Sequence, residues 1–154
     1  MAAQASTQKF RSNFSLAVYD HDPDTGSAIV VTPDAGTTDR YLDMSQYGHF
    51  VVVCAFTTGT AVTKVEIVAA SDTAGTDLTV IKDSGSITLN ALGEFHVEEC
   101  SAEEVAQAGA SSALNLRYVG ARITSSSGDE ALVTYIGMEP AHSYLNLTPA
   151  TTIS

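Results

Sequence analysis

The sequence predicts an all-β single domain, a β-sandwich or jelly-roll-like fold with one short helix and extended N- and C-terminal arms. Three observations predict it. Short runs in which apolar and polar residues alternate recur at spacings of roughly 8–15 residues, as they do in sandwiches and barrels. One segment alone has a helical pattern. The 154 residues suffice for one ordinary domain and not for two.

The first half of the chain carries four predicted strands. Residues 27–32 form a short β-branched run that ends at Pro33, and residues 49–56 are so apolar that they predict a central strand covered on both faces. Residues 63–69 alternate, and residues 77–82 form another run of strand length. In the alternating run, one face carries Val65, Ile67 and Ala69 and the other carries Lys64 and Glu66.

Alternation also defines a predicted strand at residues 94–99. Phe95 and Val97 are expected to face the core, because they are its large apolar members. Neighbouring strand residues point to opposite faces, so Glu98 and Glu99 do not form a catalytic pair. The polar members, which are expected to face solvent, are Glu94, His96 and Glu98.

Residues 101–108 carry the helical pattern. Ser101 is expected to cap the N-terminus of this helix, with Glu104 completing a capping box. Gly109 is expected to end it after barely two turns. The helix is therefore predicted to be a connector between strands.

The last part of the body predicts two more strands. Residues 114–124 change phase, which predicts a β-bulge at Val119–Gly120. Residues 125–129 predict a hairpin loop. Residues 130–138 form a strand that is apolar on both faces, so one face is expected to meet a second layer or a partner. One face holds Leu132, Thr134, Ile136 and Met138, and the other holds Ala131, Val133 and Tyr135.

Composition excludes several classes of function. The chain has 7 Lys+Arg against 18 Asp+Glu, a formal net charge of −11, which argues against nucleic-acid binding and against adsorption to an anionic membrane. No apolar run is long enough to span a membrane, and the N-terminus lacks signal-peptide features. Cys54 and Cys100 are predicted to be buried thiols, with a disulfide or a reactive thiol as the alternatives.

No motif points to catalysis or to a cofactor, so we expect a non-enzymatic binding or structural module. The four histidines are scattered, and none has a zinc-ligand spacing. Asp20, Asp22 and Asp24 alternate as Ca²⁺ ligands do, but the glycine and glutamate of an EF-hand loop are missing. This favours an acidic surface turn and leaves a Ca²⁺ site as the alternative.

Charge divides the chain into three parts. Residues 1–14 form a slightly basic N-terminal arm, residues 15–140 an acidic β-sandwich body, and residues 141–154 an extended C-terminal tail without Lys, Arg, Asp or Glu. Extended ends on a β-body favour assembly, because a strand added to a neighbour's sheet pairs main-chain groups that a lone chain leaves unpaired.

Three short motifs occur in a fixed order along the body. They are D-M-x-x-Y at residues 43–47, S-D-x-x-G at 71–75 and R-Y-V-x-x-x-I-T at 117–124. In this order they resemble the small β-rich virion structural proteins of tailed bacteriophages, over residues 39–139. The resemblance implies a capsid cement or decoration protein that binds the major capsid protein on the outer surface of the virion and stabilises the shell. It also implies a homo-oligomer, with a trimer favoured, and no catalytic residues.

The two ends supply the candidate partner-binding residues. We expect the arm to lie on the major capsid protein and the tail to add a strand to an adjacent copy. The alternative functions are a phage tail or head–tail component and a carbohydrate-binding β-sandwich module. The candidates are Lys9, Phe10, Arg11 and Phe14 in the arm and Tyr144, Leu145, Leu147 and Ile153 in the tail.

Overall fold

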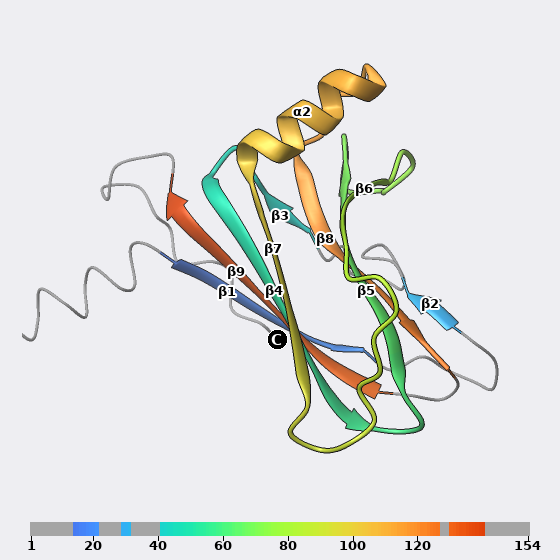
Figure 1. Cartoon of the computed structure of the whole chain (residues 1–154). Helices are drawn as coiled ribbons and strands as arrows, with labels where there is room; N and C mark the ends of the chain where they lie inside the picture. The colour runs from blue at the N-terminus through green and yellow to red at the C-terminus, as the bar shows by residue number, and fades with distance from the viewer. Residues whose placement is uncertain (1–13, 22–28, 32–40, 127–129, 141–154) are drawn as a thin grey trace, which may run out of the picture.

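Two antiparallel sheets pack face to face in the computed structural model, which describes residues 14–21, 29–31, 41–126 and 130–140 (Figure 1). Side chains are described for residues 41–126 and 131–139. Apart from one helix every described element is a strand, so the predicted all-β class is confirmed. Sheet A has the order β1 (Phe14–His21), β9 (Glu130–Pro140), β4 (Tyr47–Thr58) and β7 (Phe95–Ser101). Sheet B has the order β2 (Ile29–Val31), β8 (Tyr118–Ser125), β5 (Val62–Ala70) and β6 (Thr79–Asp83), and β3 (Leu42–Asp43) also pairs with β8.

The pairing order is that of a jelly roll. β1 pairs with β9, β2 with β8, β4 with β7 and β5 with β6, all antiparallel. The chain therefore follows one long antiparallel hairpin that is wound across two sheets. The pairs β4–β9 and β5–β8 join these units into sheet A and sheet B.

The core lies between the sheets and is built from alternate residues of each strand. The Phe50 ring packs edge-on against Tyr135, with 5.1 Å between the ring centroids. The Tyr135 hydroxyl accepts a hydrogen bond from the Ala121 N–H, which links sheet A to sheet B. Burial of a side chain such as Phe50 contributes about 1.5–3 kcal/mol. The other large buried side chains include Val52, Cys54, Val65, Ile67 and Ile123.

Both cysteines are buried free thiols, as predicted. Cys54 on β4 lies opposite His96, and Cys100 on β7 lies opposite Phe50. Burial raises the pKa of each thiol to about 12. A thiol that stays protonated inside a core is chemically inert.

The helix α2 (Ala102–Ser112) connects β7 to β8 and is longer than predicted. The capping box is confirmed: Ser101 Oγ accepts from the Glu104 N–H at 3.2 Å, and the Glu104 carboxylate accepts from the Ser101 N–H at 2.9 Å. Gly109 does not end the helix, which runs to Ser112 and closes at Ala113 in the left-handed region. A Cβ at Gly109 would lie 2.7 Å from the Leu114 carbonyl oxygen, so the glycine allows the close return of the chain. Within the described part of the chain, no helix is long and apolar enough to cross a membrane.

The predicted faces of β7 are wrong. Cys100 faces the core opposite Phe50, and alternation places His96 and Glu98 on that same side of the strand. Phe95 and Val97 consequently lie on the opposite side, 63% and 45% exposed. Pairing with β4 determines which side of β7 faces the core. Alternation along the strand does not determine this by itself.

Two predictions about the last strands are also wrong. β8 begins at Tyr118, and its register with β5 runs unbroken through Val119–Gly120, so no bulge lies there. The register shift in this pair lies between Val62 and Lys64. β8 belongs to sheet B and β9 to sheet A, so their connection crosses between the sheets and is not a hairpin.

Candidate interaction surface

One face of the sandwich leaves apolar side chains uncovered. These side chains alternate with the core residues of sheet A and point away from sheet B. We call this surface the outer face of sheet A. Its described members are Phe95, Val97 and Glu99 on β7, His49, Val51, Val53 and Ala55 on β4, and Leu132, Thr134, Ile136 and Met138 on β9.

The register aligns these side chains into rows across the strands. Val53 lies between Val97 and Thr134, and the next row runs from Phe95 through Ala55 to Leu132. Side chains directly opposite each other on neighbouring strands are in contact range. The rows therefore make one contiguous, largely apolar surface.

Exposure separates the two faces of the same strand. Leu132 is 39% exposed, whereas its neighbour Val133 is 4% exposed. Val51 and Val53 on β4 are half-buried, so the prediction that this strand is covered on both faces is wrong for its outer face. A contiguous exposed apolar patch on a domain of this size marks an interaction surface.

The outer face of sheet A ends at an open strand edge. β7 is the last strand of sheet A, and among the described strands it pairs only with β4. The Phe56 N–H donates to the Glu94 carbonyl at 3.0 Å, so the backbone groups of Glu94 and of every second residue after it face β4. The backbone groups of Phe95, Val97 and Glu99 face the open edge, next to their apolar patch.

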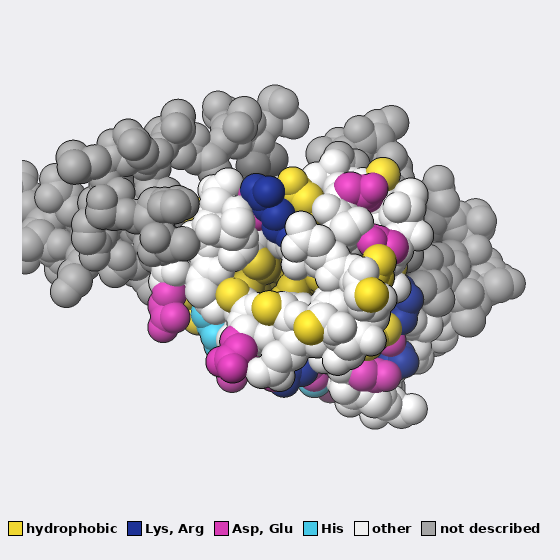
Figure 2. All heavy atoms as spheres, turned by 90° about the horizontal axis from the view of Figure 1, so that it is seen from above, with side chains coloured by type: hydrophobic (Ala, Val, Ile, Leu, Met, Phe, Trp, Pro, Cys, Tyr) yellow, Lys and Arg dark blue, Asp and Glu magenta, His cyan; other side chains and the backbone are white. Residues whose placement is uncertain are grey.

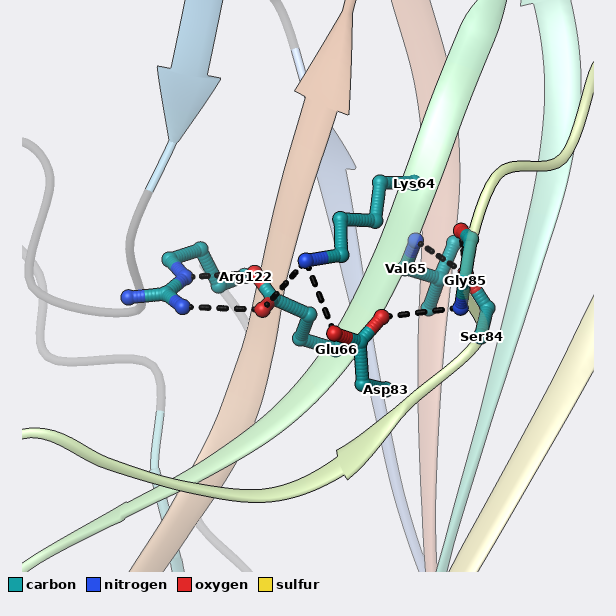
Figure 3. Close-up of polar contacts among 7 residues, drawn as sticks. All are labelled: Lys64, Val65, Glu66, Asp83, Ser84, Gly85 and Arg122. Carbon is teal, nitrogen blue, oxygen red and sulfur yellow. Dashed lines mark hydrogen bonds and ion pairs between the residues drawn. The ribbon is translucent and has the colours of Figure 1, made fainter.

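The outer face of sheet B is built differently, around a buried carboxylate (Figure 3). Glu66 is 4% exposed and accepts two hydrogen bonds from Arg122, Nε at 2.7 Å and Nη2 at 2.9 Å. Lys64 Nζ lies 3.0 Å from Glu66 and 2.8 Å from Asp83. The Arg122 guanidinium holds the pKa of Glu66 below its ordinary value. Two cations and two carboxylates on β5, β6 and β8 thus neutralise one another.

Every Lys and Arg among residues 41–126 is engaged in this way. Lys82 Nζ pairs with Glu104 at 2.5 Å, and Arg117 forms two parallel hydrogen bonds with Asp43, of which Nε–Oδ1 is 2.6 Å. In Figure 2, which looks along the sandwich from above, acidic and basic side chains are scattered instead of gathered into one patch. The described part of the chain therefore offers no cationic surface for a phosphate backbone.

His49 and His96, the histidines of sheet A whose side chains are described, each lie beside a glutamate. His49 Nε2 lies 3.4 Å from Glu99 Oε2, and His96 Nε2 lies 2.8 Å from Glu98 Oε1. Within residues 41–126 and 131–139, no group of three or more His, Cys, Asp or Glu side chains is placed to hold a metal ion. The first pair is a polar contact between β4 and β7, and the second lies within β7.

Two of the three sequence motifs meet in space and hold the fold. Asp43 of D-M-x-x-Y forms the ion pair with Arg117 of R-Y-V, next to the pairing of β3 with β8. Arg117 holds the pKa of Asp43 down at about 2. The Tyr47 ring fills the space beside Gly137, where an added Cβ would come within 2.9 Å of it.

The third motif closes the turn between β5 and β6. Asp72 Oδ1 accepts from the Ala74 and Gly75 N–H groups, both at 3.0 Å, and Gly75 has a φ of 65°. A positive φ is a position where glycine is favoured. All three motifs thus have structural explanations in the sandwich.

Most residues predicted to bind a partner or Ca²⁺ lie outside the described residues. These are Lys9, Phe10, Arg11, Tyr144, Leu145, Leu147, Ile153, Asp22 and Asp24. Phe14 is the first residue of β1 and lies opposite Met138, while β9 ends at Pro140 opposite Tyr47. The start of β1 and the end of β9 therefore lie at the same end of sheet A. The backbone of Asp20 lies in β1, opposite Leu132.

The sequence prediction found only part of the outer face of sheet A, because it expected a partner or second layer on residues 130–138 and not on β4 or β7. One signal was present, because residues 130–138 are apolar on both faces. The second signal was Cys100, whose apolar character gives the phase of β7 once the strand is extended to Ser101.

No protein-family model matches the chain, and a search of curated proteins finds no match. Among solved structures, the chain is similar to one from the Bacillus endospore appendages, described as a novel family of disulfide-linked pili. The two chains are 16% identical, the match covers 82% of this chain and 89% of that chain, and the TM-score is 0.34. A score this low does not establish a common fold, so the likeness carries no argument about function.

Proposed function

We propose that this chain is a non-enzymatic viral structural protein that binds the outer surface of a tailed-phage capsid and stabilises the shell. The outer face of sheet A is the surface that contacts the major capsid protein. The arm precedes β1 and the tail follows β9, at the end of the sheet where β1 starts and β9 stops, and both extend the contact.

The open apolar face is the observation that carries the proposal. Phe95, Val97 and Leu132 lie on one side of one sheet and are 39–63% exposed. A rigid sheet that presents such side chains gains free energy when a protein surface covers them, at about 25 cal/mol per Å² of apolar area. The resemblance of the sequence motifs to virion proteins supports a capsid protein as this partner.

The ion pairs of the body support a protein partner over a nucleic acid. Lys64, Lys82, Arg117 and Arg122 are all committed to carboxylates within the chain. The net charge of −11 also keeps many closely packed copies soluble. A tail or head–tail component would use the same kind of surface, and it differs from a cement protein in its copy number per particle.

The first test is quantitative mass spectrometry of purified virions of the phage that encodes the chain. Hundreds of copies per particle, near the number of the major capsid protein, are expected. A handful of copies would assign the chain to the tail or the portal vertex. Absence from virions would refute the proposal.

The second test places a charge on the proposed contact. Leu132→Asp is expected to weaken binding to shells that lack the protein by at least tenfold, because the charge is desolvated under the partner. Val80→Asp is the matched control, since Val80 is 42% exposed on sheet B. Equal binding of the two variants would rule out the outer face of sheet A as the contact.

A further inference from the structure

We propose that β7 pairs antiparallel with β7 of a second copy across a two-fold axis at Val97, which joins the two A sheets edge to edge. This contact forms without a shell and goes beyond the proposed function. The second copy adds a strand to a sheet that otherwise ends at β7.

The first argument is the open edge itself. Phe95, Val97 and Glu99 direct their backbone N–H and C=O groups away from β4, and none of the described strands covers them. Their side chains are accessible as well: Phe95 is 63% exposed and Glu99 is 69% exposed. An edge of this kind is a template for another strand.

The second argument is that charge selects one register. With the axis at Val97, His96 of one copy lies opposite Glu98 of the other, and Phe95 lies opposite Glu99. No like charges face each other in this register, and like charges directly opposite each other destabilise a strand pair.

The neighbouring registers are disfavoured by the same rule. Moving the axis to His96 places Glu94 opposite Glu98, and moving it to Glu98 or Glu99 places that glutamate opposite itself. Moving it to Phe95 runs the pairing into the turn at Gly93, whose φ is 92°. The glutamates of this edge therefore oppose other pairings and specify this one.

The third argument is continuity with the outer face of sheet A. Val97 meets Val97 of the second copy on the same side as Phe95 and the apolar residues of β4. The pair of sheets then presents one continuous apolar surface. The pairing stops before α2, because the Ser101 N–H is already bound by Glu104 in the capping box.

Disulfide trapping of the purified full chain tests the register. Val97→Cys is expected to convert mostly to a covalent dimer under mild oxidation, because residues facing each other across a strand pair have Cα atoms about 5.5 Å apart. Phe95→Cys is the matched control. Its two copies lie four residue steps apart, about 13 Å, so at least tenfold less dimer is expected.

The native thiols do not interfere, because Cys54 and Cys100 are buried in the core. Trapping of Phe95→Cys as efficiently as Val97→Cys would overturn the register. A monomeric Val97→Cys protein would overturn the pairing.

Sedimentation velocity of the unmodified chain gives an independent readout. A dimer is expected, and Val97→Lys is expected to raise its dissociation constant at least tenfold, because the two-fold axis brings two lysines together. Val80→Lys on sheet B is the control, and circular dichroism verifies that both variants fold. A monomer at every concentration, or a trimer unaffected by Val97→Lys, would refute the proposal. Neither assay contains a shell, so failure here is distinct from failure of the shell-binding test.

Discussion

The two outer faces of the sandwich differ in whether their side chains find partners within the same chain. On sheet B, Glu66 is buried among charges that belong to the same chain, and its ion pairs are complete. On sheet A, Phe95, Val97 and Leu132 stay uncovered within the chain. A face of the first kind stabilises the monomer, and a face of the second kind gains its stabilisation only when another molecule covers it.

The two faces differ in how deeply their side chains are buried and in which groups those side chains contact, and only partly in residue composition. Each face carries a glutamate, Glu66 on the inner strand β5 of sheet B and Glu99 on the edge strand β7 of sheet A. Glu66 is 4% exposed as a residue, whereas the Glu99 side chain is 69% exposed. The same residue type is therefore structural on one face and solvated on the other.

The largest difference in the free energy of unfolding is expected between substitutions on the two faces of β9. Val133→Asp places an uncompensated charge in the core and is expected to cost more than about 4 kcal/mol of unfolding free energy, a large part of the total stability of an ordinary domain. Leu132→Asp, one residue away on the outer face, is expected to change it by less than about 0.5 kcal/mol. Chemical denaturation of both variants measures the contrast. Similar losses would mean that the outer face is covered within the chain.

The next effect compares the two glutamates. Glu66→Ala leaves Arg122 without its partner beside a buried site and is expected to lower the free energy of unfolding by about 2–4 kcal/mol. Glu99→Ala is expected to lower it by less than about 0.5 kcal/mol, because exposed charges contribute little. Urea titrations decide the comparison. A cost for Glu99 equal to that for Glu66 would contradict the distinction between the faces.

The smallest effect concerns acid stability. Arg117 lowers the pKa of Asp43 from 3.8 to about 2, so folding favours the ionised form. The resulting stabilisation is complete above about pH 5 and is lost as the pH falls through the unfolded and folded pKa values to about 2. Because Arg117 is exposed and solvent weakens its interaction with Asp43, we expect this stabilisation to be about 1–2 kcal/mol.

Asp43→Asn is expected to remove this part of the acid dependence. Its unfolding free energy should fall less steeply than that of the unmodified chain between pH 5 and pH 2. Parallel slopes would show that the ion pair adds nothing. The carboxylate of Glu66, whose pKa is also lowered, contributes in the same direction in both proteins.

Much of the fold was predictable because it rests on local patterns. The alternation at Val65, Ile67 and Ala69 gave β5 its inner face, and the Ser101–Glu104 capping box gave the start of α2. The candidate surface was less predictable. Period-two alternation identifies two faces of a strand but does not say which one meets the second sheet.

The sequence by itself determined the sandwich class, the positions of most strands, the helix start and the buried thiols, while β1 and β3 were not among the predicted strands. Each of these follows from burial and hydrogen bonding within a few residues. Tertiary structure alone decided the phase of β7, the burial of Glu66 beside Arg122 and the crossing from β8 to β9 between sheets. Those features depend on which strands pair, and pairing joins residues such as Glu66 and Arg122 that lie far apart along the chain.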